Sequence, residues 1–177
     1  MVEAAAETPA PAQPAPGRSC GTCTLCCKVY DVPEAGTVSG QWCTHCAPGQ
    51  GCRIWDTRPE QCRAFNCLWL TQEWLGPEWK PETARMVFTM DPNTRFLMFQ
   101  VDPGAPTAWK REPYYTHIRN WAAGAARENR HVLVLVNKHA TLVLPTGEFD
   151  LGVMGPQDKF FVDRTQDGGY QVRVARA

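Results

Sequence analysis

The stretch Cys20-Gly-Thr-Cys23-Thr-Leu-Cys26-Cys27 places four cysteines within eight residues near the start of the chain. Five more follow, and residues 68–177 contain none; these five are Cys43, Cys46, Cys52, Cys62 and Cys67. Metal ligation and disulfide bonding are the two kinds of chemistry that concentrate cysteine in this way. The sulfur therefore belongs to one segment, whose fold the cysteines decide.

The cysteine pattern favours metal over disulfides. Nine cysteines would leave one thiol unpaired in a disulfide framework, and the adjacent Cys26 and Cys27 cannot bridge each other without strain. Residues 1–17 read MVEAAAETPAPAQPAPG, with Glu3 and Glu7 where a secretory signal carries positive charge, and with no continuous apolar stretch. We therefore expect a cytoplasmic protein with reduced thiols.

Three Cys-x-x-Cys turns have the spacing of metal sites. Cys20/Cys23 and Cys23/Cys26 overlap at Cys23, and Cys43/Cys46 is separate. One such turn presents two thiolates to a tetrahedral ion. Nine thiolates exceed the four ligands of a single site, and adjacent side chains point in different directions, so Cys26 and Cys27 are expected to serve two ions or one polynuclear cluster. All nine cysteines are candidate ligands, with His45 as a nitrogen alternative beside Cys46.

The motif Cys20-x-x-Cys23-x-x-Cys26-Cys27, followed by Cys52-Arg-Ile-Trp-Asp-Thr-Arg58-Pro59-Glu-Gln-Cys62-Arg63, resembles the CxxCxxCC family of zinc- or iron-chelating cysteine-cluster proteins, also called YkgJ-type proteins. The resemblance covers roughly residues 18–70. It implies a metal site built from eight cysteines, which here are Cys20, Cys23, Cys26, Cys27, Cys43, Cys52, Cys62 and Cys67. Cys46 is additional to that pattern, and the resemblance implies no particular activity.

Zinc and an iron-sulfur cluster are the two candidate cofactors. The Cys20, Cys23 and Cys26 spacing matches that of bacterial ferredoxins, but Cys27 follows at once and the ferredoxin Cys-Pro ending is absent. Several Cys-x-x-Cys turns in loop-rich surroundings favour zinc, and thiolate ligands suit either. We expect a structural or regulatory zinc protein; the alternatives are an iron-sulfur protein with a redox or enzymatic role, or a metal carrier. No P-loop, GxGxxG or HExxH motif indicates an enzyme.

The chain divides into three parts by composition. Residues 1–17 are rich in alanine and proline and are expected to be a disordered leader. Residues 18–80 form the cysteine module, with one helix predicted from a Thr57/Glu60 capping box to about Leu70. That helix would separate Cys62 and Cys67 by about 140°, so either it breaks near Asn66 or the two cysteines serve different ions or corners of a cluster.

Residues 81–177 are predicted to form an α+β part that packs on the module. Alternating and β-branched residues predict strands, and turn residues separate them; the predicted strands are 85–90, 95–101, 131–136, 140–144, 160–164 and 170–176. The segment 113–129 has apolar residues at helical spacing. The fold class is therefore α+β, with a loop-rich metal module followed by an antiparallel sheet and one packed helix.

Charge and hydropathy limit the partners. Eighteen basic and eighteen acidic side chains balance, which gives no global attraction for nucleic acid, and the longest apolar run, 132–136, is too short to cross a bilayer. The expected partners are metal ions and a protein that meets the C-terminal part. Arg53, Arg58 and Arg63 lie beside the cysteines in sequence, and two interpretations stay open for them: they neutralise the thiolates, or they are surface residues. We expect His117, His131 and His139 to be ordinary surface or sheet residues.

Overall fold

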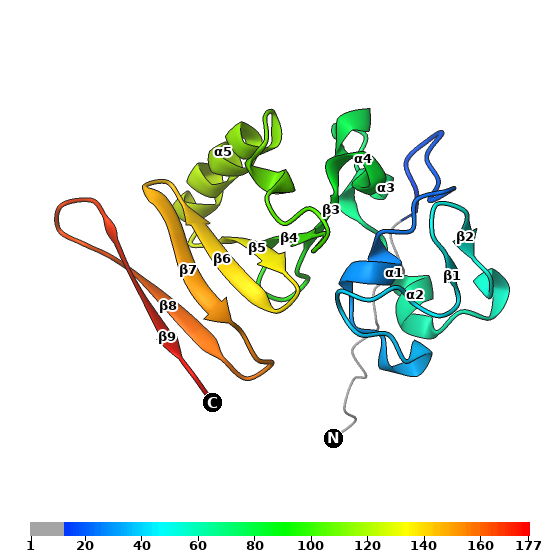
Figure 1. Cartoon of the computed structure of the whole chain (residues 1–177). Helices are drawn as coiled ribbons and strands as arrows, with labels where there is room; N and C mark the ends of the chain where they lie inside the picture. Colours follow the sequence, from blue (N-terminus) through cyan, green and yellow to red (C-terminus); the bar gives the residue numbers. More distant parts are fainter. Residues whose placement is uncertain (1–12) are drawn as a thin grey trace, which may run out of the picture.

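A computed structural model describes residues 13–177 (Figure 1). Residues 1–12 of the expected disordered leader lie outside the described residues. In the remainder of the leader, Ala15 is buried, and its backbone N–H donates to the Leu70 carbonyl at 2.8 Å. The last residues of the leader are therefore held against the protein, contrary to the prediction for 1–17.

The chain forms short helices and strands in its first half and longer ones in its second half. The α-helices are α1 (Cys26–Val29), α2 (Glu60–Ala64), α3 (Leu68–Thr71), α4 (Pro81–Ala84) and α5 (Tyr114–Arg127). The 3-10 helices are η1 (Pro33–Ala35), η2 (Trp55–Thr57), η3 (Pro77–Trp79) and η4 (Ala108–Lys110). The strands are β1 (Cys46–Ala47), β2 (Gly51–Cys52), β3 (Met86–Met90), β4 (Leu97–Val101), β5 (Val132–Val136), β6 (His139–Leu144), β7 (Gly147–Val153), β8 (Lys159–Arg164) and β9 (Tyr170–Ala175). The predicted α+β class is confirmed.

The helix predicted from Thr57 to about Leu70 breaks near Asn66, which is one of the two alternatives that the sequence left open, and its predicted start at the Thr57 capping box is wrong. Thr57 ends η2, α2 begins at Glu60 without a side-chain cap, and Phe65 leaves helical geometry with φ −77° and ψ 124°. The break turns Phe65 onto Tyr30, with ring centroids 4.9 Å apart. Because the chain breaks at 65–67, Cys67 stands at the N-cap of α3 instead of on the far side of a continuous helix.

The main sheet has the strand order β3-β4-β5-β6-β7. Three of its pairs are antiparallel as predicted, but β4 and β5 are parallel, so the sheet is mixed. The cause is the long connection through η4 and α5, which carries the chain back to the end of the sheet where β4 began. Strand β7 was not predicted, since its sequence GEFDLGV contains glycine and acidic residues that are uncommon in strands.

The two faces of this sheet are covered by different elements. Helix α5 buries Ile118, Ala122 and Ala125 against one face, together with residues of β3, β4 and β5. The other face carries Leu133, Leu142 and Leu144, and the hairpin β8–β9 packs on it through residues such as Phe160 and Val172. The alternation of side chains along each strand therefore gives the second half of the chain two apolar layers.

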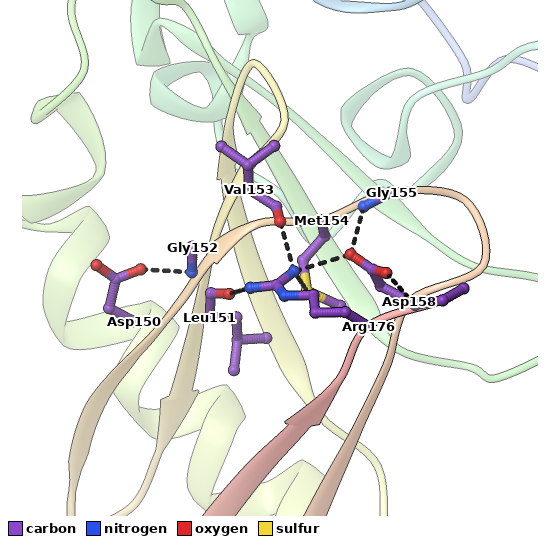
Figure 2. A network of polar contacts seen from close by, with 9 residues as sticks. Asp150, Leu151, Gly152, Val153, Met154, Gly155, Asp158 and Arg176 are labelled. Carbon is purple, nitrogen blue, oxygen red and sulfur yellow. Dashed lines mark hydrogen bonds and ion pairs between the residues drawn. The ribbon is translucent and has the colours of Figure 1, made fainter.

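Arg176 fastens the C-terminal hairpin to β7 (Figure 2). Its guanidinium donates to the carbonyl oxygens of Leu151 and Val153 and forms an ion pair with Asp158 at 2.8 Å. Gly152, with φ +69°, supports the irregular end of β7 at this point.

In residues 13–177, no helix is long and apolar enough to span a membrane.

A buried carboxylate joins the cysteine module to the sheet. Asp102 follows β4 and is fully buried, and it forms ion pairs with Lys28 of α1 at 2.7 Å and with Arg85 at the end of α4. The backbone N–H of Gly104 donates to the same carboxylate at 2.8 Å. Apolar contact accompanies the ion pairs, since Leu25 and Val29 pack with Val87 of β3.

Replacing Asp102 should weaken the whole fold. Burial opposes ionisation of Asp102, but the Lys28 hydrogen bond, the Gly104 N–H and the Arg85 charge outweigh it and lower the pKa of Asp102 below its ordinary value of 3.8. The ionised group therefore stabilises the protein above that value, and this contribution is lost as the pH falls below 3.8 toward the folded-state pKa. We expect Asp102→Asn to lower the free energy of unfolding by about 1–3 kcal/mol at pH 7, measured by urea denaturation. The exposed pair Asp163 and Arg173 provides the control: Asp163→Asn should cost less than about 0.5 kcal/mol. Equal costs for the two variants would contradict a special role for Asp102.

Candidate metal centre

All nine cysteines line one cavity of about 520 Å³ in the N-terminal module. Each is a free thiol. The cavity lies among α1, the β1–β2 hairpin and α2, the blue to cyan elements of Figure 1. Cysteines up to 47 residues apart in the chain are thus brought to a single site, Cys20 and Cys67 being the first and the last.

Two turns of the same kind present four of the thiols. The backbone N–H of Cys23 donates to the Cys20 carbonyl at 2.8 Å, and that of Cys46 donates to the Cys43 carbonyl at 2.9 Å. Gly21 supports the first turn with φ +50°, a left-handed conformation that costs glycine little. A further bond from Cys43 N–H to the Cys27 carbonyl at 2.9 Å ties the second turn to α1.

The remaining cysteines are placed by four short elements. Cys26 and Cys27 form the first turn of α1, and Cys52 stands directly opposite Cys46 in the β1–β2 hairpin. Cys62 lies in α2. Cys67 reaches the cavity from the N-cap of α3, because the chain breaks before it.

The thiols fall into two electrostatic neighbourhoods. In the first, burial raises the pKa of Cys67, and nearby Cys23 and Cys20 raise it further; Cys26 also lies close to Cys23 and Cys20. In the second, burial raises the pKa of Cys62, with added effects from Cys27, Cys43 and Cys52. Cys46 is near Cys27 and Cys43. The neighbourhoods are Cys20, Cys23, Cys26 and Cys67 on one side, and Cys27, Cys43, Cys46, Cys52 and Cys62 on the other; Cys27 also raises the pKa values of Cys26 and Cys20 across this division.

Cys27 lies at the junction of the two neighbourhoods. Its sulfur accepts hydrogen bonds from the thiols of Cys26 and Cys46, and these bonds outweigh burial and lower the pKa of Cys27 to about 7. The other shifted thiols have raised pKa values. The adjacent pair Cys26 and Cys27 therefore lies where the two neighbourhoods of thiols meet.

Basic side chains stand around the thiols, though not as the sequence predicted in every case. Arg58 and Arg63 line the cavity, and Arg58 lowers the pKa values of Cys20 and Cys62 against the larger effect of burial. Arg63 is also paired with Glu60 at 2.8 Å, and Arg53 is exposed. His45 lines the cavity beside Cys46, as its position in the sequence suggested.

Arg18 and Tyr30 are among the residues of the cavity wall that sequence reasoning missed. Arg18 donates to four carbonyl oxygens of the segment after Cys67, those of Trp69, Gln72, Glu73 and Leu75, and its guanidinium lies 5.0 Å from the Trp69 ring centroid. These hydrogen bonds connect residues about 50 positions apart, and no local sequence pattern predicts them. Tyr30 closes α1 and lies beside Cys26 and Cys67.

No family model, curated protein or solved structure matches this chain. The resemblance to the CxxCxxCC family therefore rests on the sequence motif. Among residues 13–177, no three His, Cys, Asp or Glu side chains are arranged to hold a metal ion as they stand. The cavity thus gathers the expected ligands without placing their sulfur atoms at bonding distances from a common point.

Arg18→Lys tests how the cavity wall is held. Lysine cannot reproduce a planar group that reaches four carbonyl oxygens, so we expect a loss of about 1–3 kcal/mol in the free energy of unfolding. Urea denaturation followed by tryptophan fluorescence measures it. The matched control is Arg53→Lys at an exposed position, where less than about 0.5 kcal/mol is expected. If both variants unfold at the same urea concentration, Arg18 does not hold the wall.

Proposed function

We propose that this protein binds zinc through its clustered cysteines and that the bound metal holds the N-terminal module in its folded form. The observation that carries the proposal is the convergence of all nine free thiols on one cavity. Thiolates are soft ligands that select zinc, copper(I) or iron-sulfur clusters over hard cations such as magnesium. The donor set therefore fits a thiophilic metal.

The two neighbourhoods support two ions better than one. In this proposal the four thiols of the first neighbourhood would bind one ion and the five of the second would bind the other, with Cys46 or a bridging Cys27 as the extra ligand. Four thiolates complete a tetrahedral zinc site and leave no open position for substrate. A closed site of this kind supports a structural role.

The scarcity of apolar burial in the module also supports a structural role. Between residues 18 and 67, the buried hydrophobic side chains are Leu25, Val29, Val32 and Cys46. Such a small core does not offset the conformational entropy of ordering about fifty residues. Structural zinc supplies about 10–16 kcal/mol of apparent binding energy in small folds, which is enough to make up this difference.

Metal binding requires the sulfur atoms to approach one another. Zinc bonds thiolate sulfur at about 2.3 Å, whereas no three ligand side chains among residues 13–177 converge to that degree. The backbone turns that present the cysteines are already formed by hydrogen bonds at 2.8–2.9 Å. Side-chain rotation within these turns is therefore the movement that loading requires, and burial that keeps most thiols protonated implies that loading releases protons.

Elemental analysis and an absorption spectrum of protein purified without oxygen or affinity metals test the proposal. We expect two zinc ions per chain and a colourless sample. Iron with inorganic sulfide, and a broad absorption band near 400 nm, would replace zinc with an iron-sulfur cluster and direct attention to redox chemistry. Rapid loss of zinc to a chelator would favour a metal carrier over a structural site. Protein without bound metal would contradict the proposal.

Cysteine variants test the assignment to two ions. Cys67→Ser removes a thiol from the first neighbourhood and Cys62→Ser removes one from the second, so each should lower the zinc content by about one ion per chain and destabilise the module. Ser19→Ala, which alters the cavity wall without removing a thiol, should retain both ions. Unchanged zinc content in both cysteine variants would remove these residues from the ligand set.

A further inference from the structure

Tyr30 presents a buried hydroxyl group to the cysteine cavity, and this group lacks a hydrogen-bond partner. Its Oη atom is inaccessible to water and makes no hydrogen bond of ordinary geometry, although the Thr89 hydroxyl of β3 lies close to it. Tyr30 is one of the residues that line the cavity. More than nine in ten buried polar groups in proteins have a hydrogen-bond partner. The unpartnered hydroxyl therefore indicates that a group near it accepts a hydrogen bond from it.

The surroundings of Tyr30 fix where its hydroxyl lies. The residue closes α1, and its extended backbone, with φ −112° and ψ 146°, carries the side chain away from the helical path. The ring packs on Phe65 at a centroid distance of 4.9 Å, within the apolar group that also contains Leu25, Val29 and Val87. Since this apolar packing holds the ring, the hydroxyl has little freedom to reach solvent.

Two cysteine sulfurs are the neighbours that could accept a hydrogen bond from the Tyr30 hydroxyl. Cys26 and Cys67 line the same cavity as Tyr30, and Cys26 lies four residues before Tyr30, about one helical turn away along α1. A tyrosine phenol is protonated at neutral pH and acts as a donor. A thiol is a weak acceptor, but a metal-bound thiolate carries negative charge, and hydrogen bonds to charged acceptors are about twice as strong as neutral ones.

We propose that Tyr30 is a positioning residue for the metal site, whose hydroxyl donates a hydrogen bond to the sulfur of Cys26 when that sulfur is bound to metal. The inference rests on the proposed function. The bond would orient Cys26 toward the first neighbourhood and withdraw charge from its sulfur, which lowers the nucleophilicity of the bound thiolate. Tyr30 would thereby help to direct the adjacent Cys26 and Cys27 to different ions.

Tyr30→Phe removes the hydroxyl and keeps the ring against Phe65. Cobalt(II) is the probe for the wild-type protein and the variant, because its bonds to thiolate give charge-transfer absorption that zinc lacks. We expect both proteins to bind the same amount of cobalt, with the sulfur-to-cobalt band of the variant at longer wavelength. Alkylation of Cys26 by iodoacetamide in the zinc-loaded proteins, followed by mass spectrometry, should be roughly three- to tenfold faster in the variant. Cys62 in the second neighbourhood should react at an unchanged rate.

The control is Thr89→Val, which removes the other hydroxyl group near Tyr30 Oη. It should leave the cobalt spectrum and the Cys26 alkylation rate as in the wild type. Equal spectra and equal alkylation rates for Tyr30→Phe and wild type would overturn the Tyr30 inference while leaving metal binding intact. A spectral shift in Thr89→Val as large as that in Tyr30→Phe would also overturn it, because Thr89 would then be the partner. A wild-type protein that binds no cobalt or zinc would overturn the proposed function together with the inference.

A measurement on the unmodified chain covers the case in which Tyr30→Phe does not fold. In cadmium-loaded wild-type protein, a Tyr30 hydroxyl bonded to sulfur should give a slowly exchanging proton signal with a nuclear Overhauser contact to the Cys26 β protons. The signal should be absent from the metal-free protein. Contact of that proton with Thr89 alone would contradict the assignment.

Discussion

The N-terminal module contains too little buried apolar surface to hold its own loops. The four buried hydrophobic side chains between residues 18 and 67 contrast with the sheet region, where α5, β3, β4 and β5 share one continuous apolar cluster. A chain segment of this kind is ordered by cross-links or by attachment to a larger body. Polar contacts attach the module to the sheet region, and the nine thiols around one cavity are the groups that the proposed metal would cross-link.

The attachment to the sheet and the cysteine cavity share the same short helix, α1. Helix α1 supplies Cys26 and Cys27 to the cavity, and the next residue, Lys28, forms the ion pair with Asp102. Because the helix is only four residues long, a rotation that moves the two sulfur atoms also moves the ammonium group beside them. Asp102 is buried and cannot gain a water partner if Lys28 leaves. The buried carboxylate therefore favours the orientation of α1 in which both cysteines face the cavity.

The sequence predicted the parts of this structure that depend on local pattern. The apolar face of α5 was visible at Ile118, Ala122 and Ala125, and the turn 91–94 correctly separated β3 from β4. Sequence-based prediction did not fix the conformation where contacts between distant residues decide it. The break at Phe65 exists because that ring packs on Tyr30, thirty-five residues earlier, and the capping-box pattern at Thr57 and Glu60 is overridden in the process. The parallel pairing of β4 with β5 likewise follows from the path of the chain through α5 rather than from the residues of either strand.

For the candidate site, residue type and spacing identified all nine thiols and His45, because cysteine chemistry is readable from composition. The supporting residues were not identified, since Arg18 and Tyr30 act through contacts that only folding creates. The surroundings of Cys26 and Cys27 depend on both their adjacency in the sequence and the fold. Adjacency makes their side chains diverge, and in the fold Cys26 also has Cys20 and Cys23 as neighbours, whereas Cys27 also has Cys46. Helix α1, which carries both cysteines, is held on one side by the ion pair of Lys28 with Asp102 and on the other by the backbone hydrogen bond from Cys43 N–H to the Cys27 carbonyl.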